Sequence, residues 1–174
     1  TGQDGETSAD FMFDRYEVAP LDTLDKPLGN GRDLRLALGF SGTLEQMQDR
    51  LHARLRFTDA KIPDLTRFTR YQHAGGMKIL SGSGTISADM RTYVQGERSE
   101  GSEGSFIVAA RNAGLRIGEL AVRTDLKLDA KLQGGKLGGT AFSADGSTLK
   151  LSNTRILEPA SEHTTPWSAD IRIE

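Results

Sequence analysis

The stretch "GELAVRTDLKLDAKL" (residues 118–132) decides the fold that the sequence predicts. Apolar Leu126, Leu128 and Leu132 alternate with charged residues, and a period of two is typical of a strand with one apolar face. The alternation slips once, at residues 122–124, which is the pattern of a β-bulge. One strand could therefore extend about 50 Å at 3.3 Å per residue. Such a length favours a wide curved sheet over a compact sandwich.

The same alternation recurs along the rest of the chain. The runs are Leu34, Leu36, Leu38 and Phe40; Leu51, Ala53, Leu55 and Phe57; Ile86, Ala88 and Met90; Phe106, Val108 and Ala110; Leu149 and Leu151; and Trp167, Ala169, Ile171 and Ile173. We therefore predict a mainly β fold, in which a long, curved and mostly antiparallel sheet forms an open groove or half-barrel.

Polar segments separate the predicted strands. Residues 95–105 should form a long solvated loop, residues 133–139 a glycine turn, and residues 144–148 a turn built on an Asp-Gly pair. Residues 1–31 have no clear assignment. We expect residues 1–174 to form one β-rich domain, which is a segment of a larger protein because the sequence lacks an initiator Met and a leader.

Two segments depart from the alternation. Residues 63–72 begin with Pro63 and space apolar side chains at three-residue intervals, so we predict one short α-helix there. In residues 43–51, Thr43 and Gln46 stand in the relation of a capping box, which indicates a second helix. A hairpin loop competes with this second helix, because strand alternation resumes at residue 51.

A tripeptide recurs at uneven spacing. Ser-Ala-Asp occupies residues 8–10, 87–89, 143–145 and 168–170, which suggests a duplicated strand unit with Ala facing inward. Small residues recur on the inward face of the predicted strands. They are Ala53, Ala88, Ala130, Ala144 and Ala169. The space above them could hold acyl chains, or Phe and Trp side chains could fill it.

Composition excludes several function classes. The 22 basic and 24 acidic residues give a formal charge of −2 and are spread along the chain, so we expect no nucleic-acid partner. The sequence has no cysteine, which excludes disulfides and thiolate metal sites. It also contains no run of 18 apolar residues that would span a membrane.

No catalytic pattern stands out. His52, His73 and His163 lack partners at catalytic or metal-binding spacing, and we interpret them as surface or edge residues. The glycines of "GSGTISAD" (residues 82–89) lead into a strand, whereas a phosphate-binding loop opens a helix. Asp89, Asp145 and Asp170 of the repeat fit a solvated strand face, with turn hydrogen bonds or calcium as the alternative. We expect no enzymatic activity, no cofactor and no metal site.

Residues 57–90, "FTDAKIPDLTRFTRYQHAGGMKILSGSGTISADM", resemble a known family. A strand, then Ile-Pro-Asp-Leu, a short aromatic helix, a glycine break and an apolar Ser-Gly-Ser-Gly strand follow in the order seen in AsmA-like bacterial envelope proteins, relatives of TamB. The likeness extends over residues 32–157. It implies a long β-groove in the periplasm, a membrane anchor that lies outside this sequence, and a role in carrying phospholipids toward the outer membrane.

We therefore expect a non-enzymatic lipid-binding or transfer segment in the periplasm. Its partners would be phospholipid or fatty acyl chains, together with envelope proteins. The candidate groove lining is Leu36, Leu38, Leu55, Phe57, Ile86, Ala88, Met90, Val108, Leu128 and Leu151. Arg67 and Arg70 are candidate headgroup contacts, although arginines on a capping helix could also lie in water. The alternative is a structural or protein-interaction β-module of the envelope, with a closed core and no lipid.

Overall fold

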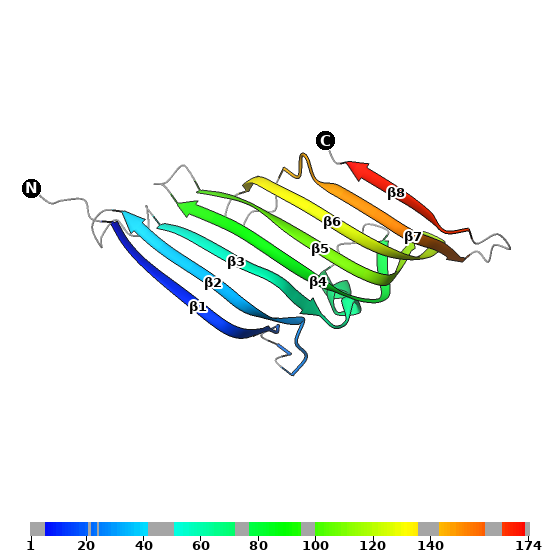
Figure 1. Ribbon diagram of the computed structural model, residues 1–174, viewed down its shortest axis with the longest axis horizontal. Helices are drawn as coiled ribbons and strands as arrows, with labels where there is room; N and C mark the ends of the chain where they lie inside the picture. The colour runs from blue at the N-terminus through cyan, green and yellow to red at the C-terminus, as the bar shows by residue number, and fades with distance from the viewer. Residues whose placement is uncertain are drawn as a thin grey trace, which may run out of the picture.

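One antiparallel sheet accounts for nearly all of the described chain (Figure 1). The computed structural model describes residues 6–20, 22–23, 25–41, 51–71, 77–94, 100–135, 143–158 and 165–172. The strands are β1 (Glu6–Val18), β2 (Gly29–Ser41), β3 (Leu51–Ile62), β4 (Met77–Val94), β5 (Glu100–Ile117), β6 (Leu120–Gly135), β7 (Thr148–Glu158) and β8 (Trp167–Arg172). Each strand pairs with its neighbours in sequence, so the sheet is a meander.

The predicted fold class is confirmed: the protein is mainly β, and its strands are long and antiparallel. β4 and β5 contain 18 residues each, about three times the usual strand length. The sheet is open and uncurled, with β1 and β8 as its two opposite edges (Figure 1). It therefore does not close toward the half-barrel that was one of the two predicted shapes.

β-Bulges interrupt the strands at two levels. Asp33, Asp59, Asn112 and Asn153 have φ between 50° and 57°, and each coincides with a shift of register toward the next strand. Gly82 in β4, with φ of 127°, lies level with Asn112, and Gly82, Asn112 and Asn153 form the bulge row of β4 to β7. Asp33 and Asp59 lie at a second level, because Ser87 beside Asp59 pairs with Ile107. Asp and Asn adopt this left-handed conformation more readily than other residues with a side chain. A bulge bends its strand along the strand's own length, which differs from the curling across strands that would bring β1 toward β8.

Side chains of the adjacent strand stabilise two of these bulges. The Asp59 N–H donates to Ser87 Oγ at 2.9 Å, and the Asn112 N–H donates to Asp125 Oδ1 at 2.9 Å. The second carboxylate oxygen of Asp125 accepts from Asn153 Nδ2, also at 2.9 Å. Asp125 thus joins bulges in β5 and β7 across the strand between them.

The break in alternation at residues 122–124 is confirmed as a bulge. The pairing of β6 with β7 shifts register between Arg123 and Asp125. At the shift, the buried hydroxyls of Thr124 and Thr154 hydrogen-bond to each other at 2.8 Å. Because each hydroxyl has a partner, burying them carries no penalty for a lost hydrogen bond.

The helix predicted at residues 63–72 has the expected place but a different type. It is a 3-10 helix, η2 (Leu65–Tyr71), so the prediction of an α-helix is wrong. Asp64 Oδ1 accepts from the Thr66 N–H, and the Thr69 hydroxyl donates to the Thr66 carbonyl three residues earlier. These local bonds favour the tighter three-residue turn, which is common in short helical segments.

The connections are partly as predicted. The Asp-Gly turn at 144–148 is confirmed, since the Ser147 N–H donates to the Ala144 carbonyl and Gly146 has φ of 77°. The loop expected at 95–105 is shorter, because β5 already begins at Glu100 and its glycines and serines pair with β4.

Other predicted connections lie partly outside the described residues. They are residues 43–50 of the alternative helix and residues 136–139 of the glycine turn. Within residues 1–31, which the sequence left unassigned, β1 is a strand whose Ala9, Phe11 and Phe13 alternate like those of the other strands. Three Ser-Ala-Asp copies lie in strands, whereas residues 143–145 lead into the turn.

Candidate functional site

Cross-strand register gathers the apolar residues of all eight strands on one side of the sheet. Residues that pair directly share a face, and the row Phe57, Ala88, Phe106 and Ala130 is a typical example. We call the following set the apolar face. It comprises Ala9, Phe11, Phe13, Leu34, Leu36, Leu38, Phe40, Leu51, Ala53, Leu55, Phe57, Ile86, Ala88, Met90, Phe106, Val108, Ala110, Leu126, Leu128, Ala130, Leu132, Leu149, Leu151, Trp167, Ala169 and Ile171.

The apolar face extends across all eight strands, with some polar residues between its members. The polar residues at paired positions on this side include Thr7, Thr92 and Ser102. The Thr92 and Ser102 hydroxyls hydrogen-bond to each other at 3.0 Å, and Ser102 is buried. A surface of this composition suits hydrocarbon, because it offers contact area without leaving a polar group that needs water.

All ten predicted lining residues lie on the apolar face. Each is half-buried, and none belongs to the buried core. Ala88 lies between Phe57 and Phe106 on the flanking strands, so large and small side chains alternate across the sheet. The neighbouring strands thus partly shield these side chains from water.

The buried core is concentrated near η2. Leu65 and Phe68 of η2 pack with Ile62, Ala110 and Ala113 at the bulge row. Ile79, Ile86 and Leu126 also pack against this cluster. Ile86, predicted as groove lining, therefore also supports the core. Among the helices and strands that the structure describes, η2 alone packs on the apolar face from outside the sheet, so these described elements leave most of that face uncovered.

The predicted headgroup contacts lie in η2. Arg67 is half-buried, and its Nη1 donates to the Pro27 carbonyl in the connection between β1 and β2. Its Nε lies 3.8 Å from Asp64 Oδ2. Hydrogen bonds from Thr66, with a smaller contribution from Arg67, lower the pKa of Asp64. Arg67 thus ties η2 to the neighbouring connection. The side chain of Arg70 lies outside the described residues.

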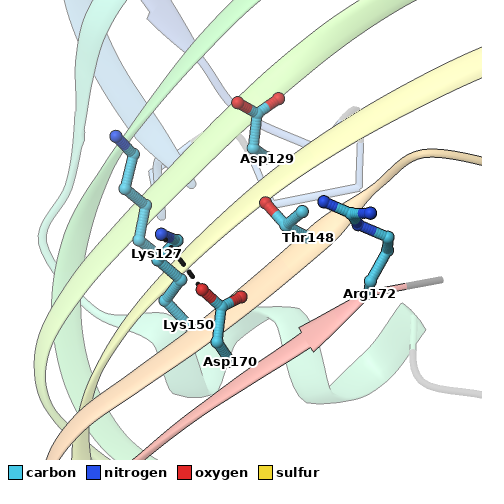
Figure 2. Close-up of a pocket in the computed structure, with 6 residues that line it drawn as sticks. All are labelled: Lys127, Asp129, Thr148, Lys150, Asp170 and Arg172. Carbon is cyan, nitrogen blue, oxygen red and sulfur yellow. Dashed lines mark ion pairs between the residues drawn. The ribbon is translucent and has the colours of Figure 1, made fainter.

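The opposite side of the sheet is polar. Figure 2 shows a shallow depression there, lined by Lys127, Asp129, Thr148, Lys150, Asp170 and Arg172. Lys150 Nζ lies 3.1 Å from Asp170 Oδ2, and both side chains are exposed. Lys127 and Lys150 lie opposite each other on β6 and β7, and Asp170 lies opposite Lys150 on β8. With Asp129 and Arg172, both signs are present and the excess of positive charge is small. The depression has the character of a solvated strand face, as predicted for Asp170.

A second ion pair on the polar side joins β3 and β4. The Arg54 guanidinium donates to both oxygens of Asp89, at 2.8 Å and 2.6 Å. Arg54 holds the pKa of Asp89 below its usual value, first through this hydrogen bonding and then through charge. The pair is partly exposed, so it contributes little to stability and mainly fixes local register. Asp145, the third predicted outward carboxylate, lies exposed in the turn after residue 144.

The histidines supply no catalytic constellation in the part of the chain that can be described. His52 on β3 pairs with Gly39 and with Tyr93, on the polar side. His73 and His163 lie outside the described residues. Within the described ranges, no three His, Asp or Glu side chains gather as metal ligands. The same ranges contain no helix of the length and apolar character needed to span a bilayer.

Several residues of the apolar face were missed by the sequence analysis as lining, including Phe11, Phe13 and Phe106. The signal was present, because Ala9, Phe11 and Phe13 alternate in the same way as the recognised runs.

No protein-family model matches this chain, and no curated protein or solved structure is significantly similar to it. The resemblance to AsmA-like proteins therefore stays a prediction.

Proposed function

We propose that this protein is a non-enzymatic lipid-binding segment that shields acyl chains on its apolar face. One observation carries the proposal: an apolar face runs from β1 to β8, and among the described elements only η2 covers part of it. A protein of this size would ordinarily bury such a surface against a second layer. Acyl chains are ligands that make the apolar contacts this face offers and need no hydrogen bonds from it.

The polar side of the sheet supports the same proposal. Ion pairs such as Arg54 with Asp89 and Lys150 with Asp170 lie on that side. The sheet therefore has one side suited to water and one suited to hydrocarbon. A two-sided surface of this kind would let a lipid lie along the strands on the apolar side while its headgroup reaches solvent at an edge or strand end.

The resemblance to AsmA-like proteins extends the proposal to a compartment and a pathway. The segment would work in the periplasm, as part of a protein anchored in the inner membrane. It would support phospholipid transport toward the outer membrane, with envelope proteins as further partners. Arg67 and Arg70 remain candidate headgroup contacts. For Arg67, such a contact would have to be made beside its bond to the Pro27 carbonyl.

The alternative is a structural or protein-interaction module that contains no lipid. That reading requires a second layer over the apolar face. The core cluster beside η2 is the covered part of the apolar face. Residues of this face outside the cluster, such as Leu36 and Leu55, are only half-buried. The uncovered area therefore favours lipid binding over a closed module.

Lipid extraction tests the proposal directly. Protein produced in a bacterial envelope is purified, extracted with organic solvent and analysed by mass spectrometry. We expect phospholipid or fatty acid in stoichiometric amount. Delipidated protein should then bind a fluorescent fatty acid with saturation. Extracts without lipid, combined with no saturable binding of the probe, would show that the apolar face has another occupant.

A further inference from the structure

Both edges of the sheet expose large apolar side chains. On β1, Phe11 and Phe13 are 46% and 44% exposed, and on β8, Trp167 and Ile171 are 42% and 47% exposed. Both strands have one row of backbone N–H and C=O groups that no other described strand pairs. Unpaired edges that also expose apolar side chains are surfaces on which another strand can pair.

We propose that β8 of one copy of this chain pairs antiparallel with β1 of a second copy, so that the sheet continues from copy to copy. Strand direction permits this, because β1 to β8 alternate in direction and a following β1 runs antiparallel to β8. The added strand satisfies the backbone groups of both edges.

The repeated tripeptide makes the two edges complementary. Both carry Ser-Ala-Asp, at residues 8–10 on β1 and 168–170 on β8. When Ala9 is placed opposite Ala169 in an antiparallel pair, each Asp of one tripeptide falls opposite the Ser of the other. A hydroxyl can donate to each carboxylate in this register, so Asp10 gains a hydrogen-bond donor and Asp170 gains one in addition to Lys150.

The same register also aligns the apolar side chains. Phe11 falls opposite Trp167, and Thr7 falls opposite Ile171, on the side that carries the apolar face in both copies. A slip of two residues, with Phe11 opposite Ala169, would instead place Asp10 directly opposite Asp170. Like charges at opposed positions destabilise a strand pair, so the first register is favoured over that slip.

This contact is head-to-tail, and it does not close on itself in an open sheet. An assembly of any length keeps one free β1 at one end and one free β8 at the other. The average mass should therefore rise steadily with protein concentration and should not stop at two chains. The apolar faces of successive copies would lie on the same side and form one longer surface.

Two edge variants test the proposal. Phe11→Lys places a charge on the β1 edge, and Ile171→Lys does the same on β8. Both positions are exposed in the single copy, so both variants should fold, as circular dichroism would verify. We expect sedimentation velocity to show wild-type protein growing with concentration and each variant alone remaining one chain, with association weakened at least about tenfold.

Mixing the two variants is the decisive measurement. Phe11→Lys protein keeps a native β8, and Ile171→Lys protein keeps a native β1, so an equal mixture should form two-chain particles and nothing larger. Leu120→Lys is the matched control, because Leu120 is exposed but is the first residue of β6, an inner strand, and not part of either edge. This control should associate like wild type.

Three outcomes would overturn the proposal. The first is wild-type protein that stays one chain at every concentration. The second is a single variant that still forms dimers, which would indicate pairing of two identical edges. The third is association that neither edge variant reduces, which would indicate contact through the apolar faces.

Discussion

Single polar side chains hold the bulge row together, and Asp125 shows how. Its carboxylate accepts one hydrogen bond from the Asn112 N–H and one from the Asn153 amide. These bonds lower the pKa of Asp125, with Asn153 as the largest cause, then Asn112, and with a smaller contribution from the charge of Arg111. The ionised carboxylate is therefore the form that the folded protein favours.

Replacing Asp125 should destabilise the protein in a pH-dependent way. We expect Asp125→Ala to lower the free energy of unfolding by about 1 kcal/mol at pH 7, measured by urea denaturation. Because the folded pKa is lowered, this contribution is present above the ordinary carboxyl pKa of about 4 and is lost as pH falls through the folded value. Asp129→Ala, on the same strand, should change stability by less than about 0.5 kcal/mol. Equal effects of the two variants would contradict this role.

Glycines differ in how tightly the adjacent strand approaches them. A Cβ at Gly84 would lie 2.4 Å from the backbone oxygen of Ala109, whereas a Cβ at Gly39 would meet the side chain of His52. A side chain can rotate away, but a paired strand cannot move without losing hydrogen bonds. The two positions therefore differ in tolerance, although both are glycines within strands.

We expect Gly84→Ala to cost about 2 kcal/mol or more in unfolding free energy, because β4 and β5 must separate locally. Gly39→Ala should cost clearly less, since only the imidazole of His52 has to move. Thermal and urea unfolding of both variants would measure the difference. A Gly84→Ala protein as stable as Gly39→Ala would show that the strands yield more easily than their backbone contact implies.

The 3-10 helix η2 is the element that gives the sheet a core. Leu65 is 8% exposed and packs with Ile62, Ala110 and Ala113. Without η2 these residues would face water like the rest of the apolar face. The sequence located this element from Pro63, Asp64 and the spacing of its apolar residues. It could not show the 3-10 geometry, which depends on hydroxyl and carboxylate hydrogen bonds over three residues.

Truncation of Leu65 tests this contribution. We expect Leu65→Ala to lower the unfolding free energy by about 3 kcal/mol, as for other buried leucines. Leu120→Ala, at an exposed leucine, should cost far less. Denaturant titration followed by circular dichroism measures both. If the two variants cost the same, η2 does not form a core with the sheet.

Among the strands, alternation located seven of the eight elements, although several extend beyond the predicted runs. β5 is the clearest case, since Gly101 and Ser102 belong to the strand and pair with Tyr93 and Thr92. Glycine and serine carry no strand signal of their own, and only the partner strand provides the hydrogen bonds that make them extended. The bulges at Asp59 and Asn112 also have a sequence signal, which is an Asp or Asn at the point where alternation breaks. Whether such a residue forms a bulge depends on its pairing with the facing strand.

Substitutions on the two faces of the sheet can be compared to test lipid binding. Leu38 lies on the apolar face at a half-buried position away from η2, and Ala37 lies on the polar side opposite Arg54. We expect Leu38→Asp to reduce fatty-acid binding at least about tenfold, because a charge would lie against the acyl chain. Fluorescent fatty-acid titration measures the change.

The control is Ala37→Asp, which adds the same charge one residue away on the polar side and should bind like wild type. Ile86→Asp is a poorer test, because Ile86 packs against the core cluster and its replacement should unfold the protein. Circular dichroism separates loss of fold from loss of binding. Equal loss of binding in folded Leu38→Asp and Ala37→Asp proteins would rule out the apolar face as the site.

The sequence by itself determined which side of each strand is apolar, because a period of two assigns every residue to a face before any partner is known. It therefore placed all ten candidate lining residues on one side of the sheet. Only the tertiary structure decided that the sheet stays open, that bulges bend its strands at two levels, and that η2 covers one region of the apolar face. Those features depend on hydrogen bonds and packing between residues far apart in the chain, and local alternation carries no information about such partners.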